Sequence, residues 1–218
     1  NLLHAILDKE KKKVVTGAQD MHSDPSKVVE LPNGNLRIYE KQKYYPPIGS
    51  LLSSKGDREK DRYAPAFDFK ECQNITLNNV TVHHALGMAY LFERSENIKI
   101  RGCKVVLPPN SDRVISSTAD ATHFANCKGD ILIEGCTFEN MLDDGTNVHG
   151  TYVEVNKIID SKTIRVALKH FEQLGFKFAA PGDEVWFIKY PSPARAETNT
   201  VTKINIINET YMDLTFAN

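Results

Sequence analysis

Carboxylates and imidazoles are concentrated in two short polar stretches near the middle of this 218-residue chain. Asp120 and His123 lie in the first stretch, and Asp143, Asp144 and His149 lie in the second. Asp143 follows Asp120 by 23 residues and Asp144 follows it by 24. General acid–base catalysis uses paired carboxyl groups within reach of one substrate. The spacing therefore indicates a hydrolytic site, provided that the fold brings the two stretches side by side.

A repeat surrounds these stretches and predicts how they are brought together. Three segments align on their phenylalanines, the first two offset by 23 residues and the last two by about 32, with the extra residues placed within 106–118: Phe69 to Val82, Phe92 to Val105 and Phe124 to Phe138. Each unit is predicted to hold two short strands with an Asn or Gly between them. A period of 20 to 25 residues built of short strands is typical of a solenoid.

A parallel β-helix fits this repeat better than a leucine-rich repeat, whose leucine register is absent. Its coils lie about 4.7–4.9 Å apart, so equivalent residues form columns. One column is apolar (Phe69, Phe92 and Phe124), and another is polar (Asn74, Asn97 and Asp130). The alignment also puts Met88, Asp120 and Asp143 in one column.

Two like charges about 5 Å apart are unfavourable, and such a pair tends to retain one proton. That arrangement suits a general acid facing a general base, as in glycoside hydrolysis, where the separation of the carboxyl groups selects retention or inversion. The sequence alone does not choose between these outcomes. Two other interpretations stay open: Asp143-Asp144-Gly145 as a plain turn with Asp120 as a cap, and a calcium site of three carboxylates.

Polar residues beside the aspartates are candidates for contacts with a substrate. We expect Thr118, His123, Asn147 and His149 to bind it, and the two histidines to bond either a sugar or the aspartates. A histidine pair without a further ligand does not make a metal site, and none of the four cysteines forms a Cys-x-x-Cys pair, so no metal is predicted.

The flanks of the repeat predict separate all-β modules. We divide the chain into a β module with a loop (1–66), β-helix coils that carry the site (67–151), and an inserted β-barrel-like module (152–218). Residues 27–39 read as a hairpin, and the charged stretch Ser53 to Arg62 reads as a loop. Trp186 stands between Val185 and Phe187, where a core position is favoured over stacking on a sugar.

The composition excludes some classes of partner. The net charge is −1 and the pI is about 6.7, so a nucleic-acid partner is not indicated. No apolar run approaches the roughly 18 residues of a membrane span, so membrane insertion is not expected. The oligomeric state is left open. The sequence opens and closes like the interior of a protein, and we expect a segment of a longer chain.

Three motifs resemble glycoside hydrolase family 110, the α-1,3-galactosidases that act on terminal galactose of blood-group-B-type and related glycans. The motifs are residues 117–124, 136–140 and 143–150, with supporting matches at 82–88 and 94–98. The resemblance runs through residues 65–155. It departs from the family pattern at residues 51–56, where a more basic strand is expected.

This resemblance implies a right-handed parallel β-helix, an exo-acting and inverting hydrolase, and no metal or other cofactor. It implies Asp120 as the general acid and Asp143 and Asp144 as the base function that holds the attacking water. The implied partner is a glycan with terminal α-galactose, and the implied location is secreted or periplasmic. The alternatives are another β-helical polysaccharide hydrolase or lyase, and a non-catalytic glycan-binding β-helix.

Overall fold

The computed structural model describes residues 2–19, 21–55, 64–170, 173–189, 191–192 and 194–218. These residues form strands and turns without an α-helix, as the predicted all-β class requires. They accordingly hold no helical segment that could span a bilayer. The chain divides into two compact units, residues 1–149 and 150–218. The three-part division given above stays a prediction.

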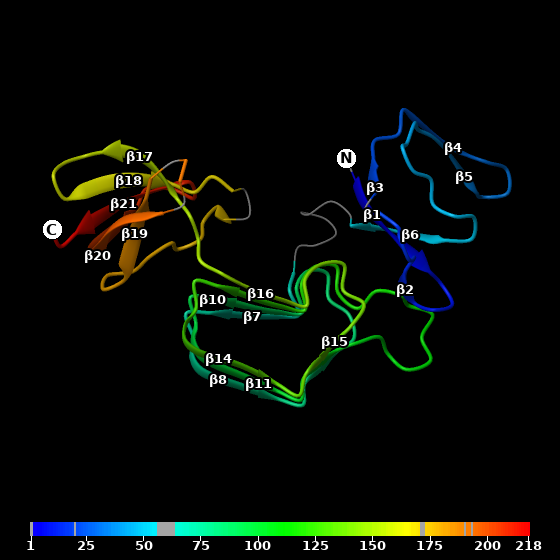
Figure 1. The fold of residues 1–218 in the computed structure, drawn as a ribbon, viewed down its shortest axis with the longest axis horizontal. Helices are drawn as coiled ribbons and strands as arrows, with labels where there is room; N and C mark the ends of the chain where they lie inside the picture. The colour runs from blue at the N-terminus through cyan, green and yellow to red at the C-terminus, as the bar shows by residue number, and fades with distance from the viewer. Residues whose placement is uncertain (1, 20, 56–63, 171–172, 190, 193) are drawn as a thin grey trace. The chain divides into compact units, whose positions relative to one another are not determined.

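Three parallel sheets make up the repeat region, and each repeat gives one strand to each sheet (Figure 1). The first sheet contains β7 (Phe67–Lys70), β10 (Tyr90–Glu93), β13 (Thr122–Ala125) and β16 (Thr146–His149). The second contains β8 (Gln73–Asn78), β11 (Glu96–Arg101) and β14 (Lys128–Glu134). The third contains β9 (Thr81–Val82), β12 (Lys104–Val105) and β15 (Thr137–Phe138). The prediction of two strands per repeat was therefore wrong by one.

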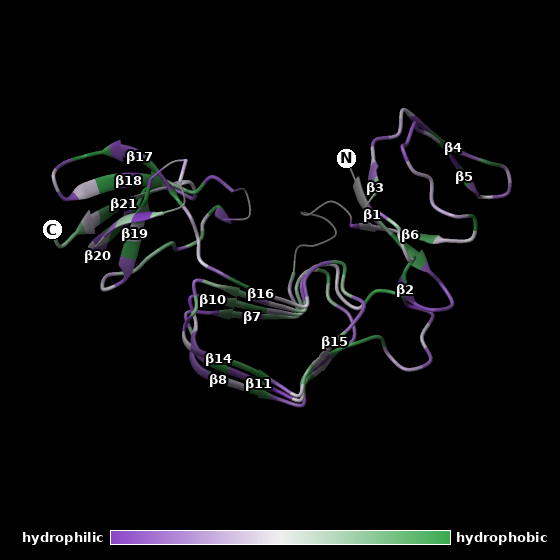
Figure 2. Ribbon diagram, viewed as in Figure 1, coloured by the Kyte–Doolittle hydropathy of each residue, from purple (hydrophilic) through white to green (hydrophobic). Residues whose placement is uncertain are grey.

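The apolar column of phenylalanines is confirmed. Phe92 pairs in register with Phe69 on one side and with Phe124 on the other. Its ring stacks on theirs at centroid distances of 5.0 and 4.9 Å, with interplanar angles of 9° and 5°. Hydrophobic residues lie along the strands, whereas several of the turns between them are hydrophilic (Figure 2). The interior of the repeat is thus a continuous stack of side chains.

The polar column is confirmed in two of its three members. Asn97 donates from Nδ2 to Oδ1 of Asn74 at 3.4 Å. The next coil contributes a backbone group, because the amide of Asp130 donates to Oδ1 of Asn97 at 3.3 Å. The residue that shares the left-handed backbone of Asn74 (φ 56°) and Asn97 (φ 55°) is Gly129 (φ 63°), so the Asp130 side chain is not the third member. The register shifts by one residue here, which makes Gly129 and Asp130 the site of a β-bulge.

The N-terminal strands form two small antiparallel sheets. β1 (Leu2–Asp8) pairs with β2 (Lys13–Val14), β3 (Met21–Ser23) and β6 (Leu51–Lys55). β4 (Lys27–Glu30) and β5 (Leu36–Tyr39) form the predicted hairpin. The loop predicted from Ser53 was wrong at its start, since β6 continues to Lys55. Its remainder, at 56–63, lies outside the described residues.

The second unit is one antiparallel sheet in the order β17-β18-β21-β20-β19. Its strands are β17 (Glu154–Ile158), β18 (Thr163–Ala167), β19 (Glu184–Ile188), β20 (Arg195–Ile206) and β21 (Tyr211–Phe216). Val166, Val201 and Leu214 are buried in its core. Arg165 and Asp213, on neighbouring strands, form a two-bonded ion pair with distances of 2.7 and 3.0 Å. Trp186 is 59% exposed, so the core position favoured for it was wrong.

Candidate active site

The backbone register decides which aspartate stacks on Asp120. Thr122 pairs with Thr146, and the amide of Ala121 donates to the carbonyl oxygen of Asp144 at 2.9 Å. Asp144 therefore occupies the position next to Asp120 in the column, and the prediction of Asp143 there was wrong. On the other side the amide of Ala89 donates to the carbonyl oxygen of Asp120, which confirms Met88 as the apolar neighbour.

A single extra residue causes this difference. The coil from Phe67 to Tyr90 takes 23 residues, whereas the coil from Thr122 to Thr146 takes 24. The third sheet still pairs Val105 with Phe138, and the stretch from Phe138 to Thr146 matches in length the stretch from Val82 to Tyr90. The added residue is accordingly the bulge at Gly129 and Asp130. The bulge shifts the column from Asp143 to Asp144.

The three aspartates converge at the end of this column. Asp120, Asp143 and Asp144 each offer a carboxylate oxygen, and these atoms lie within 4.8 Å of one another. Asp120 is buried, at 4% exposure, while Asp143 and Asp144 are exposed. The sequence predicted this meeting of the two stretches, and the parallel pairing of β13 with β16 produces it.

Each carboxylate has its own partner within the chain. His123 Nδ1 lies 2.6 Å from Oδ2 of Asp120, and Asn147 Nδ2 donates to Oδ2 of Asp144 at 3.3 Å. The ammonium group of Lys55 bonds Oδ2 of Asp143. Three such carboxylates could also hold a cation. Because each is already engaged by a group of the protein, the arrangement favours proton transfer over metal binding.

A chain of imidazoles connects Asp120 to the surface. His123 Nε2 lies 2.7 Å from Nε2 of His149, and the two rings meet edge to face at a centroid distance of 4.7 Å. His123 is half-buried on β13 and His149 is exposed on β16. Of the two alternatives for these histidines, the structure shows bonding to an aspartate for His123. This contact fixes the orientation of the Asp120 carboxyl group.

Lys55 is the residue of the site that the sequence did not reveal. It ends β6, lies 88 residues before Asp143, and keeps only 11% of its side chain exposed. No periodicity links the N-terminal strands to the repeat, so spacing gave no signal. The available signal was the unmatched strand at residues 51–56, the point of departure from the family pattern.

The hydroxyl groups of the first stretch mainly support the backbone. Thr122 Oγ1 donates to the hydroxyl of Thr146 at 2.9 Å, and Ser117 Oγ donates to the carbonyl oxygen of Ala119 at 2.8 Å. Thr118 Oγ1 is buried and makes no hydrogen bond within the described part of the chain. The structure thus brings His123, Asn147 and His149 to the carboxylates but leaves the hydroxyl of Thr118 enclosed.

Comparison with known proteins identifies the relatives of this chain. The GLAA-B β-barrel domain I matches residues 4–52, and the GLAA-B β-barrel domain II matches residues 163–218. The α-1,3-galactosidase A of Shewanella woodyi is 38% identical over 158 residues, which are 72% of this chain and 26% of that protein. This chain is a relative of the α-1,3-galactosidases. The resemblance to glycoside hydrolase family 110 is thereby confirmed.

Other α-1,3-galactosidases match in the same way. The B enzyme of Phocaeicola vulgatus is 41% identical over 142 residues, which cover 65% of this chain and 24% of that protein. The A enzyme of Bacteroides fragilis is 30% identical over 187 residues, which cover 86% of this chain and 30% of that protein. The chain therefore spans about a quarter of the length of these relatives. The two matched barrel domains lie on either side of the repeat, as predicted for the flanking modules.

Proposed function

We propose that this chain carries the acid–base centre of an exo-acting α-1,3-galactosidase built on a right-handed parallel β-helix. The observation that carries the proposal is the convergence of three carboxylates, one of them buried, on neighbouring parallel strands. The three parallel sheets, with one strand from each repeat, support the β-helix. The names of the relatives support the substrate, a glycan with terminal α-1,3-linked galactose.

In the proposed mechanism, protonated Asp120 donates to the glycosidic oxygen while Asp143 and Asp144 hold and deprotonate a water on the opposite face of the sugar. His123 positions Asp120 through its 2.6 Å contact, and Lys55 holds Asp143 in place. His149 and Asn147 contact sugar hydroxyl groups at the rim, and Thr118 reaches the substrate once its enclosed hydroxyl group turns. No cofactor takes part in these steps.

Inversion of configuration follows from the resemblance, since an inverting site needs room for a water between its carboxyl groups. The nearest carboxylate oxygens lie within 4.8 Å of one another, and bound sugar would have to separate them. Galactose release from an α-1,3-galactobioside, followed by proton NMR, gives the anomer formed first. We expect β-galactose before mutarotation. Initial α-galactose would show retention and would contradict the assignment of a water-holding pair.

Substitution of each aspartate by asparagine separates the acid from the base. We expect Asp120→Asn to lose about 10²–10⁴-fold in turnover of a natural disaccharide. The same variant should keep most of its activity on a dinitrophenyl α-galactoside, whose leaving group needs no proton. Asp144→Asn should be inactive on both substrates. If Asp143→Asn alone keeps activity on the aryl substrate, the acid is Asp143 and Asp120 belongs to the base.

A calcium-dependent β-helical lyase is the second candidate, because three carboxylates at this distance also suit a cation. Such an enzyme would require calcium and form an unsaturated product that absorbs in the ultraviolet. A non-catalytic glycan-binding β-helix would bind galactosides without turnover and would tolerate asparagine at Asp120 and Asp144. We further propose a secreted or periplasmic location, which fractionation of cells that produce the native protein would test.

A further inference from the structure

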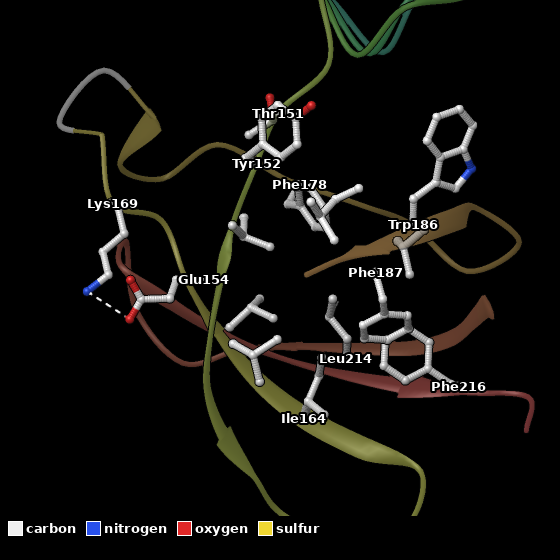
Figure 3. A pocket seen from close by; sticks show the side chains of 15 residues that line it. Thr151, Tyr152, Glu154, Ile164, Lys169, Phe178, Trp186, Phe187, Leu214 and Phe216 are labelled. Carbon is white, nitrogen blue, oxygen red and sulfur yellow. Dashed lines mark ion pairs between the residues drawn. The ribbon is translucent and has the colours of Figure 1, made fainter. Parts of the chain in front are cut away.

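The second unit contains a hollow of its own, of about 450 Å³, which the catalytic proposal does not use (Figure 3). It lies between β17 and β19, the two edge strands of the five-stranded sheet. Within the described residues each of these strands pairs on one side only, with β18 and with β20. The floor is apolar and is formed mainly by Ile164, Val166, Phe178, Phe187, Leu214 and Phe216.

Two exposed aromatic residues border this hollow. Trp186 is 59% exposed and Tyr152 is 75% exposed, although both rings belong to its lining. Figure 3 shows the side chain of Trp186 pointing away from that of Phe187, on the opposite side of the strand from the core. Large aromatic side chains that are left in water around an apolar hollow mark a surface for binding.

The Trp186 ring is held in a fixed orientation. Its Nε1 donates to Oε1 of Glu184 at 2.8 Å, and the guanidinium group of Arg195 lies over the ring at 4.4 Å from the centroid. A cation over one face of an indole restrains the ring and leaves the other face for a ligand. A ring restrained in advance loses little side-chain entropy when a ligand packs against it.

Charged groups surround the apolar floor. Lys169 and Glu154 form an ion pair of 3.3 Å that belongs to the same lining, and Glu184 and Arg195 flank Trp186. A pyranose sugar has an apolar C–H face and a rim of hydroxyl groups, so it matches an aromatic ring bordered by carboxylates and ammonium groups. Charged partners also form the stronger hydrogen bonds to hydroxyl groups. A purely apolar ligand would leave these charges without use.

We propose that this hollow is a second carbohydrate-binding site, which holds a hexose unit of a galactose-containing glycan against Trp186 and Tyr152. The choice of galactose rests on the function proposed above, whereas the site itself involves none of the catalytic residues. It would hold a branched or extended substrate on the enzyme while another terminus reacts. The free edges of β17 and β19 also offer backbone groups to an added peptide strand, so the test includes that occupant.

Trp186 is the only tryptophan in the sequence, so the intrinsic fluorescence above 295 nm reports on this site alone. We would titrate the Asp120→Asn variant, which is unable to consume the ligand, with α-1,3-galactobiose and separately with a pentavaline-type β-strand peptide. We expect a saturable change with the disaccharide at about 0.1–10 mM, the affinity of a site with few contacts. No change with the disaccharide, or a change with the peptide alone, overturns the proposal.

Variants and an independent readout complete the test. In saturation-transfer NMR, Trp186→Ala should weaken disaccharide binding at this site about tenfold or more. Tyr45→Ala is the matched control, because Tyr45 is 62% exposed and lies in the other unit. Equal binding in the two variants sinks this inference. Galactose release by the unmodified chain without a Trp186 response refutes the second site alone, whereas a Trp186 response without release refutes only the proposed activity.

Discussion

Gly129 tests whether the bulge holds the register of the site. Its backbone is left-handed, with φ at +63°, and a Cβ added there would meet Oδ1 of Asn97 at 2.2 Å. Gly129→Ala should therefore destabilise the first unit in two ways. The left-handed conformation costs a non-glycine residue about 1–2 kcal/mol. The clash also displaces the Asn97 amide from its two hydrogen bonds, and loss of these long, partly exposed bonds adds about 1 kcal/mol.

Gly135→Ala is the matched control. Gly135 has nearly the same φ, +61°, and nothing lies within 4 Å of its added Cβ. It should cost the conformational part alone, so the two variants should differ by about 1 kcal/mol. Urea unfolding followed by far-ultraviolet circular dichroism measures this difference. For a slope of about 2 kcal/mol per molar, the midpoint of Gly129→Ala should lie about 0.5 M below that of Gly135→Ala.

A double variant isolates the contribution of the amide. In an Asn97→Gly background the clash is gone, so Gly129→Ala should cost no more than Gly135→Ala does. Equal midpoints for the two single variants would refute the reasoning, because they would show that the Asn97 ladder contributes nothing. If the ladder holds the bulge, Gly129→Ala should also lower galactosidase activity more than Gly135→Ala, since the bulge sets Asp144 beside Asp120.

Three further predictions concern other contacts. Lys55→Met should leave the exposed Asp143 without its cation and lower the stability of the first unit by about 1–2 kcal/mol in urea unfolding; no change would show that the pair is only a surface contact. Phe92→Leu should lower it by about 1–3 kcal/mol, because two stacked ring contacts are lost, and an unchanged midpoint would contradict the column. The hydrogen bonds from Arg165 lower the pKa of Asp213, so this carboxylate adds stability above its unfolded value of about 3.9, and that stability is lost as the pH falls through the folded pKa. The gap between wild type and Asp213→Asn should accordingly be largest near pH 6 and close toward pH 2, and a gap independent of pH would exclude the ion pair as its source.

Much of the site could be predicted because the repeat is local in sequence. Parallel coils place equivalent residues in columns, so the spacing of Phe69, Phe92 and Phe124 sufficed to predict their stack. The same logic brought Asp120 beside the Asp143-Asp144 pair, with Met88 on its other side. The flanking modules were predicted from their strands and turns, and both match β-barrel domains.

Two features were decided by the tertiary structure alone. The register of the last coil depends on a bulge of one residue at Gly129 and Asp130, and a period counted by eye does not detect one added residue. The partner of Asp143 depends on where β6 ends, since Lys55 meets it across 88 residues with no shared repeat. Sequence therefore determined which residue types share a column, because chain length per coil is nearly constant. Which carboxylate stacks on Asp120, and which cation it is denied to Asp143 or given, followed from pairing between segments that no local pattern connects.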